Sequence, residues 1–579
     1  MSSFLYSTMA SEEKFIEEMF EKGILVNKEL LNKEVDQNLL SKVQAEGDII
    51  VLNEDYINVL KGQTTLVDWY EIDRYRVEAE KERDEDLYQS QLQQLGHSNL
   101  TLQSHNLQQS QELTSLETKI ELDIPTNSLT TTSSSLVAPE AHNLELHVKA
   151  GSKINEPSFE ITGITLVINY ENKPHKFNVK DFTNVFITRY RFIENILRHR
   201  QELQNNLAIN RLEKKKEKEA ISIIGIILDI GVTKNGNLIL KMEDLTGSIS
   251  VIVSKNKTEL FSLAKDLVLD EIVGIVGVCH EKVIFADQVV WPDLPEINEI
   301  KKGPEEEFVI FLSDIHVGSK KFLKEEFDKF LQWINGKVGN DQQKEIAHKV
   351  KYIIIAGDTV DGVGIYPSQE EELEIKDVKE QYIEFARLIK QIPLNKQIII
   401  CPGNHDATHL AEPQPPFYKD YAAEMFTLPN VTLVSNPAMV NIGKKDNFSG
   451  FDVLLYHGYS FDYYVANVES IRNGGGYHRA DLIMKFLLKR RHLAPTFKST
   501  PYFPGYTEDP LLIKKIPDFF ITGHIHYCAV ANYKGVTMIS GSCWQGKTSF
   551  QEKLGHEPEP ARVPIVNLKT RQIKILKFN

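Results

Sequence analysis

The sequence has few of the features that mark secreted and membrane proteins. It contains only four cysteines among 579 residues and no CxxC pair, which argues against a disulfide framework and against a zinc knuckle. No apolar run approaches the ~20 residues that a membrane helix needs. Acidic residues also stand near the start, where a signal peptide would carry basic ones. We therefore expect a soluble, cytoplasmic protein with reduced cysteines and no membrane partner.

The chain also lacks an excess of positive charge, since 66 basic residues stand against 81 acidic ones and the net charge is −15. This balance argues against a protein that coats nucleic acid through bulk positive charge. Contact with nucleic acid would have to be local, and bound divalent cations could reverse the sign of a small acidic site. The net charge therefore leaves the class of substrate open.

The length predicts several folded units. Apolar residues recur at helical spacing between Phe15 and Leu31, so we expect a small helical domain over residues 1–77. Residues 78–157 are rich in Gln, Ser, Asn and Thr, a composition that predicts a flexible linker. Residues 158–219 predict a strand and a basic amphipathic helix, whose arginines we interpret as a solvated face in preference to a phosphate-binding surface. Those arginines are Arg189, Arg191, Arg198 and Arg200.

Residues 220–295 show short alternating strands that are typical of an OB barrel. A helix is predicted around residues 257–267, between the third and the fourth of five strands, where that barrel usually carries one. Many β-barrels alternate in this way, and the sequence has no obvious row of exposed aromatic residues for base stacking. A structural or docking role for this segment is therefore as compatible with the pattern as DNA binding.

Residues 305–579 repeat one pattern, in which an apolar run ends in residue types that bind metals. Runs such as FVIFLSDIH and KYIIIAGDTVDG predict buried strands whose ends meet at one edge of a sheet sandwich. Mixed nitrogen and oxygen donors suit manganese, iron or zinc better than calcium. We expect two divalent cations, manganese first, with magnesium, iron and zinc as alternatives, at the roughly 3.5–4 Å separation that suits in-line displacement at phosphorus. The predicted ligands are Asp314, His316, Asp358, Asn404, His457, His524 and His526.

Two further residues are predicted to act in catalysis. His405, next to Asn404, could protonate the departing oxygen, and Asp361 could hydrogen-bond the far nitrogen of His405 to keep it oriented. His409 is interpreted as a hydrogen-bonded loop histidine, and the glycines at 474–476 as a turn before a helix. We leave both outside the catalytic set.

The metal-binding pattern resembles that of the calcineurin-like metallophosphoesterase superfamily. Its elements DxH, GDxxD, GNH(D/E), H and GHxH occur here in that order. The resemblance implies a four-layer αββα domain, in which Asp358 is a ligand of both metals. Asp314, His316 and His526 would complete one site, and Asn404, His457 and His524 the other. The expected fold class is thus a multidomain chain with a small helical N-terminal domain, an OB-fold barrel and a C-terminal α/β metallophosphoesterase domain.

The helix, the OB-like segment, the phosphoesterase domain and the tail around Trp544, Gln545 and Phe550 together resemble the small subunits of archaeal D-family DNA polymerases. The resemblance covers about residues 160–579. It implies a 3′–5′ exonuclease that proofreads DNA primer 3′ ends for a separate large catalytic subunit, with a sliding clamp as a further partner through the complex. The alternatives are a non-catalytic polymerase scaffold and a free-standing metallophosphatase. Related eukaryotic subunits have generally lost ligands, so the complete set here favours proofreading.

Overall fold

The computed structural model describes residues 163–171, 176–212, 218–296, 299–504, 508–554 and 556–579. It also describes two short strands that pair in parallel, β1 (Leu25–Val26) and β2 (Val51–Leu52). Apart from these strands, the helical domain and the linker predicted for residues 1–157 lie outside the described residues. The chain divides into two compact units, Met1–Lys149 and Ala150–Asn579, and all elements discussed below belong to the second.

Five strands form a closed barrel in the order β4-β5-β6-β8-β7. In β5 the residues Leu238, Leu240 and Met242 point inward and are buried, because successive side chains of a strand face opposite sides. The predicted helix is present as α8, between the third and the fourth strand of the barrel. The bounds are β4 (Glu219–Val232), β5 (Leu238–Asp244), β6 (Gly247–Val253), α8 (Thr258–Ala264), β7 (Ile272–His280) and β8 (Val283–Val290).

Two six-stranded mixed sheets form the larger part of this unit, in the orders β12-β11-β10-β9-β18-β19 and β16-β17-β15-β14-β13-β3. Strands β9, β10 and β11 run parallel, and so do β14 and β15. The first sheet comprises β9 (Phe308–Leu312), β10 (Val350–Ala356), β11 (Gln397–Cys401), β12 (Val431–Leu433), β18 (Arg562–Asn567) and β19 (Ile573–Lys577). The second comprises β3 (Ile164–Ile168), β13 (Ala438–Ile442), β14 (Phe451–Leu455), β15 (Phe519–Thr522), β16 (Ala529–Tyr533) and β17 (Val536–Ser540).

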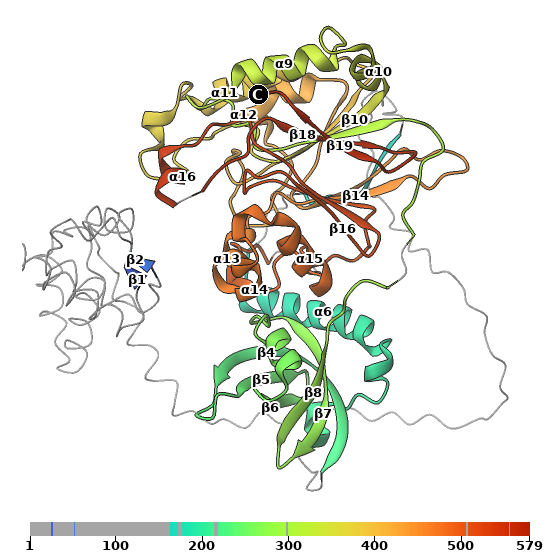
Figure 1. Cartoon of the computed structure of the whole chain (residues 1–579), viewed down its shortest axis with the longest axis vertical. Coiled ribbons are helices and arrows are strands. Elements are labelled where there is room, and N and C mark those ends of the chain that lie inside the picture. Colours follow the sequence, from blue (N-terminus) through green and yellow to red (C-terminus); the bar gives the residue numbers. More distant parts are fainter. Residues whose placement is uncertain are drawn as a thin grey trace, which may run out of the picture. The chain divides into compact units, whose positions relative to one another are not determined.

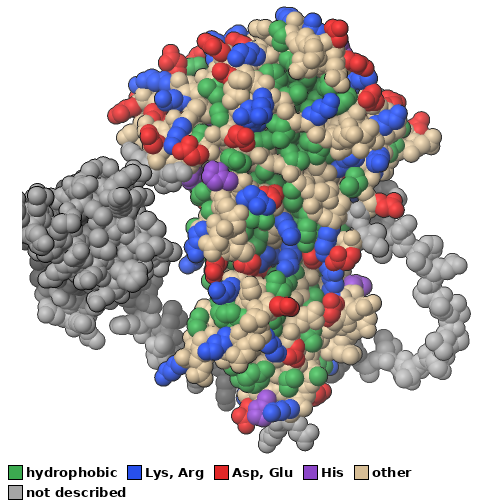
Figure 2. Space-filling model, in the orientation of Figure 1, with side chains coloured by type: hydrophobic (Ala, Val, Ile, Leu, Met, Phe, Trp, Pro, Cys, Tyr) green, Lys and Arg blue, Asp and Glu red, His purple; other side chains and the backbone are tan. Residues whose placement is uncertain are grey.

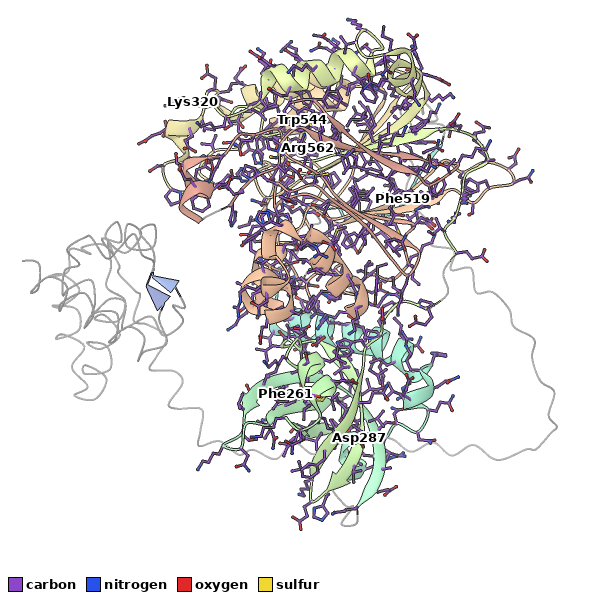
Figure 3. All side chains as sticks on the ribbon, in the orientation of Figure 1. Phe261, Asp287, Lys320, Phe519, Trp544 and Arg562 are labelled. Atoms are coloured by element: carbon purple, nitrogen blue, oxygen red, sulfur yellow. The ribbon has the colours of Figure 1, made fainter. Side chains whose placement is uncertain are left out.

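Helices cover the outer faces of the two sheets, so the sandwich has four layers (Figure 1). Phe311 of the first sheet packs against Phe519 of the second, with ring centroids 5.9 Å apart, in the core between the sheets; Phe519 is labelled in Figure 3. The next residue, Leu312, faces the helices on the other side of the first sheet, and Phe520 faces those on the second. These helices are α9 (Lys324–Ile334), α10 (Asp341–Lys349) and α11 (Val378–Ile389) on one side, and α13 (Phe461–Asn467), α14 (Glu469–Asn473) and α15 (Ala480–Arg490) on the other.

Two segments that precede the barrel in the sequence contact the sandwich. Strand β3 pairs antiparallel with β13 and forms the edge of the second sheet. Helix α6 (Val179–Arg198) starts at a capping box on Asn178. Its Arg189 is 1% exposed and forms a 2.5 Å ion pair with Asp509. The interpretation of this helix's arginines as a solvated face is therefore wrong for Arg189, which is a buried structural cation.

Buried charges also join the barrel to the sandwich. Arg490, at the end of α15, lies 2.7 Å from Glu271 of the barrel, and the two side chains are 4% and 1% exposed. The guanidinium of Arg490 stacks over the ring of Phe486 at 3.3 Å, and Lys489 lies 3.5 Å from the ring centroid of Trp291. Removing one partner of a buried ion pair leaves an uncompensated charge. The barrel and the sandwich therefore depend on each other at this joint.

The surface of the described residues carries both signs of charge. In the view of Figure 2, lysine and arginine are interspersed with aspartate and glutamate over the whole described face. All four cysteines are buried and free. Among the described residues, no helix has the length and apolar character needed to cross a membrane.

Candidate metal centre

The predicted ligands lie on loops that follow five strands of the two sheets. Because β9, β10 and β11 run parallel, their carboxyl ends meet at the same edge of the first sheet. The carboxyl ends of β14 and β15 meet likewise in the second sheet. Asp314 and His316 follow β9, Asp358 follows β10, Asn404 follows β11, His457 follows β14, and His524 and His526 follow β15.

One group of ligands forms around His316. Its Nε2 atom lies 3.0 Å from Nε2 of His526, which in turn lies 3.4 Å from Oδ1 of Asp314. The carboxylate of Asp358 approaches the same group, with Oδ2 3.9 Å from His316 Nε2. One donor atom from each of Asp314, His316 and His526 lies within 4.8 Å of the others, a spacing that suits a single ion.

The second group forms around Asn404. Its Oδ1 atom lies 3.0 Å from Nε2 of His457 and 3.0 Å from Nδ1 of His524. Oδ2 of Asp358 lies 3.2 Å from His457 Nε2, so this carboxylate reaches both groups. The structure thus brings all seven predicted ligands together in the grouping that the superfamily pattern implies, while metal binding itself stays a prediction.

The backbone of these loops is strained at the ligands. A positive φ is uncommon for residues other than glycine; it costs of order 1–3 kcal/mol and persists only where the surrounding structure enforces it. Strain of this kind clusters at functional sites. The ligands with positive φ are Asp314 (50°), His316 (53°), Asp358 (51°), His524 (73°) and His526 (55°).

Two glycines of the motifs are required by close approach. A Cβ atom on Gly403 would lie 2.2 Å from Oδ1 of Asp358, and one on Gly523 would lie 2.5 Å from Oδ2 of Asp314. Any side chain at either position would displace a ligand carboxylate. The glycine before Asn404 and the glycine before His524 are therefore part of the site's construction.

Neighbouring groups fix the orientation of the histidines. Nδ1 of His316 lies 3.1 Å from the Asp361 carboxylate, and Nδ1 of His457 lies 2.8 Å from the carbonyl of Ala356. On His524 the outer nitrogen is Nε2, which lies 3.0 Å from Asp462. A ring that donates its outer N–H to such an acceptor presents the lone pair of its other nitrogen to the centre, as a metal ligand requires.

The hydrogen bond predicted between the Asp361 carboxylate and His405 is wrong, because His405 bonds the backbone carbonyl of Asp361 instead. Nδ1 of His405 donates to the backbone carbonyl of Asp361 at 2.7 Å. The carboxylate instead accepts hydrogen bonds from His316 and from the amides of Gln545, at 2.7 Å, and Gln369, at 2.9 Å. Asp361 therefore positions the ligand His316 through its side chain and His405 through its backbone.

Several supporting residues were not predicted from the sequence. The amide of Gln551 lies 2.9 Å from Nδ1 of His526. Asp406 accepts hydrogen bonds from the backbone of Gly403, at 2.8 Å, and from the hydroxyl of Tyr382, at 3.1 Å. Burial and the nearby Asp358 carboxylate raise the pKa of Asp406 to about 6. Asp406 is the last residue of the GNHD motif, so the sequence offered a signal for its role. No sequence motif marks Gln551.

The donor set fits divalent cations in its charge as well as in its geometry. Asp314 and Asp358 are at most 1% exposed. Burial opposes ionisation, but His457 and His405 lower the pKa of Asp358 well below its ordinary value. Burial also lowers the pKa of His457, but the Asp358 carboxylate outweighs it and raises that pKa to about 10. The buried carboxylates thus require compensating positive charge, from protonated histidines or from cations, and these donor types suit manganese, iron or zinc.

Comparisons with known proteins decide the family. A family model that describes the B subunits of DNA polymerases alpha and epsilon matches residues 309–529. The chain is 39% identical over 402 residues to the DNA polymerase II small subunit of Methanothermobacter thermautotrophicus, which covers 69% of this chain and 80% of that protein. The chain belongs to the family of archaeal DNA polymerase II small subunits. The predicted resemblance to D-family small subunits is confirmed.

Two other DNA polymerase II small subunits show the same likeness. That of Methanocaldococcus jannaschii is 40% identical over 393 residues, covering 67% of this chain and 64% of that protein. That of Pyrococcus furiosus is 36% identical over 428 residues, covering 73% of this chain and 68% of that protein.

A pocket opens over the predicted ligands of this small-subunit chain. Its volume is about 280 Å³, and it is lined by His316, Asp358 and His405 together with aromatic side chains. A wider pocket of about 620 Å³ adjoins it and shares His405 and Tyr459. His409 borders the wider pocket, but its Nδ1 bonds the carbonyl of Ala411 at 2.7 Å, in agreement with a hydrogen-bonded loop histidine.

Proposed function

We propose that this chain is the proofreading subunit of a heteromeric replicative DNA polymerase, a 3′–5′ exonuclease that works beside a large catalytic subunit. The observation that carries the proposal is the complete ligand set, arranged in two groups that share Asp358. A purely structural subunit would not need histidines whose outer ring nitrogens are hydrogen-bonded so that the inner ones face a common point. Nor would it need positive φ angles at five of the predicted ligands. The family supports the polymerase context, because its members are named as small subunits of a DNA polymerase.

The proposal includes the identity of the two domains. The order of the metal-binding motifs and the four layers support a calcineurin-like metallophosphoesterase sandwich. The closed five-stranded barrel, with α8 between its third and fourth strands, supports an OB domain. We assign the barrel no contact with DNA.

The cations would be held by the two ligand groups described above, and manganese is our first choice. When bound, they would supply an activated water and the positive charge that a phosphodiester needs during displacement. The chain's own residues would do the rest. Asp361 and Asp462 keep His316 and His524 oriented. The Asp358 carboxylate accepts the backbone N–H of His405 at 2.8 Å, which ties the loops after β10 and β11 together.

His405 would assist the departing oxygen. Its Nδ1 atom is held by the Asp361 carbonyl, so its other nitrogen is left for the pocket, where it lies near His316 and Asp358. An imidazolium at this position can donate a proton to the 3′ oxygen as the P–O bond breaks, with the hydroxyl of water added to phosphorus. The products are a nucleoside monophosphate and a DNA strand shortened by one nucleotide.

The substrate would be a single-stranded 3′ end. A paired end must be unstacked before its last phosphodiester can reach a recessed site, and mismatched ends are unstacked at lower cost. This preference would give proofreading its selectivity. The mixed surface charge fits a short contact with one strand end better than a long nucleic-acid track.

The decisive experiment measures the release of mononucleotides from matched and mismatched primers in manganese, with and without the large subunit. We expect faster release from the mismatched primer and no release by an Asp358→Ala variant. A wild-type chain that binds no metal and releases no nucleotide would support the scaffold alternative. Faster turnover of a generic aryl phosphate than of DNA would instead support a metallophosphatase.

A further inference from the structure

An aromatic pair beside the metal centre has no part in the chemistry described above. The rings of Tyr366 and Phe550 are stacked, with centroids 5.1 Å apart and planes inclined by 18°. Both side chains line the 280 Å³ pocket, together with the ligands His316 and His526. Phe550, in the short helix α16 (Ser549–Leu554; Figure 1), is 39% exposed. The pair therefore presents exposed aromatic surface, to which another ring can bind, next to the predicted metal ligands.

One carboxylate holds the pair in place. The hydroxyl of Tyr366 donates to Oε2 of Glu372 at 3.0 Å. The backbone N–H of Ser549, the residue before Phe550, donates to Oε1 of the same carboxylate at 3.1 Å, and the Ser549 hydroxyl bonds it as well. Glu372 therefore ties both rings to one point, and the aromatic surface is organised before any ligand arrives.

The two glutamines that line the pocket are already engaged. Gln545 donates to Asp361 and to Ser319, and Gln551 bonds His526. A second aromatic pair, Tyr477 and His556, has ring centroids 4.1 Å apart and lines the same pocket. The pocket thus offers ring faces and metal ligands, but few free groups for reading hydrogen-bond patterns.

This combination fits one nucleotide. Ring faces bind any base by stacking, whereas identification of a base needs free donors and acceptors. The volume of about 280 Å³ lies just below the range of small-molecule pockets, roughly 300–1,000 Å³. A pocket of this size is on the scale of a single unstacked nucleotide.

We propose that Tyr366 and Phe550 form a stacking platform for the base of the 3′-terminal nucleotide, regardless of which base it is. This inference rests on the proposed exonuclease function and adds the binding site for its substrate. The platform would hold the base while the adjacent phosphodiester lies at the metal ligands. Base stacking on an aromatic side chain contributes enough to change affinity about 5- to 150-fold.

The kinetic test compares two ends of the same single-stranded oligonucleotide, one with a terminal adenine and one with a terminal abasic sugar. With the adenine end, Phe550→Leu should raise KM about 5- to 150-fold and leave kcat unchanged, because stacking stabilises the bound substrate and the transition state equally. Phe550→Trp, which keeps a ring face, should match the wild type. With the abasic end, all three proteins should have equal KM. Phe426→Ala, which removes a 45% exposed aromatic side chain that does not line the pocket, is the matched control.

A leucine variant that behaves like the wild type would overturn the platform, as would one that loses equally on both ends. Failure of the exonuclease itself is distinguished by a binding assay that needs no turnover. The full-length chain is titrated in EDTA against an oligonucleotide ending in 2-aminopurine, whose fluorescence falls on stacking. Quenching by the wild type and by Phe550→Trp, but not by Phe550→Leu, supports the platform even if no nucleotide is released. Equal quenching by all three refutes it.

Discussion

Asp361→Asn tests whether the carboxylate of residue 361 orients His316 or His405. The carboxylate is fully buried and accepts hydrogen bonds from three donors, namely the ring of His316 and the amides of Gln369 and Gln545. Asparagine has nearly the same volume but offers one acceptor oxygen and one donor group. His316 and Gln545 both bond Oδ1, so an amide oxygen at that position keeps these two contacts without the negative charge. The amide of Gln369, which bonds Oδ2, loses its acceptor, at a cost of about 1–3 kcal/mol for a buried donor.

The loss should appear in metal binding. A neutral amide makes the histidine less basic than a carboxylate does, and mutation of such a partner typically weakens metal affinity about 10- to 100-fold, which corresponds to roughly 1.4–2.7 kcal/mol. Only the cation held by His316 should be affected. His405 should be unchanged, because it bonds the backbone carbonyl of residue 361, which asparagine retains.

Calorimetric titration with manganese and the exonuclease rate as a function of manganese and pH would measure these effects. We expect one weakened manganese site, a rate that recovers at saturating manganese, and an unchanged pH profile. Asp446→Asn, which removes an exposed carboxylate in a turn, controls for the change in net charge. Unaltered manganese affinity combined with a shifted pH profile would refute this reasoning and assign the carboxylate to His405.

Three further predictions follow from buried charges. Asp358→Ala should abolish nucleotide release but leave co-purification with the large subunit intact, since Asp358 lies in the metal centre. Glu271→Ala should lower the free energy of unfolding, measured in urea, by about 3–5 kcal/mol, because it leaves the buried Arg490 guanidinium and the indole N–H of Trp291 without their acceptor. His492 has its pKa lowered to about 4 by burial and the nearby Arg189. Unfolding releases it to bind a proton, so stability should fall by about 3 kcal/mol between pH 6.5 and pH 4, and less so in His492→Gln.

The clustering of the seven predicted ligand residues could be predicted because the pattern that carries it is local in the sequence. Each ligand sits just after an apolar run, and parallel strands place such positions at one edge. The same logic predicted the strands of the barrel and the helix between its third and fourth strands. What the pattern could not show is which side chains meet across the sheets, and so the Asp361 carboxylate was assigned to His405 instead of His316.

The wrong interpretation of Arg189 has a similar origin. An arginine on a basic amphipathic helix is usually solvated, and no residue near Arg189 in the sequence indicates that it pairs with a buried carboxylate. Its partner, Asp509, lies 320 positions further along the chain. Strand β3 joins the second sheet over a comparable separation. Pairings of this length depend on the tertiary fold, so a periodicity measured over a short window contains no information about them.

The tail after β17 supports both the predicted metal ligands and the aromatic platform. Trp544 is fully buried, and its backbone N–H donates to the carbonyl of Asp314 at 2.8 Å (labelled in Figure 3). The next residue, Gln545, reaches the carboxylate that orients His316, and α16 then adds the platform residue Phe550. Side chains fixed by close packing hold a site more accurately than free loops do. Since one anchored segment supports both the metal ligands and the aromatic surface, loosening it would weaken metal binding and base stacking together, which neither single-site variant does.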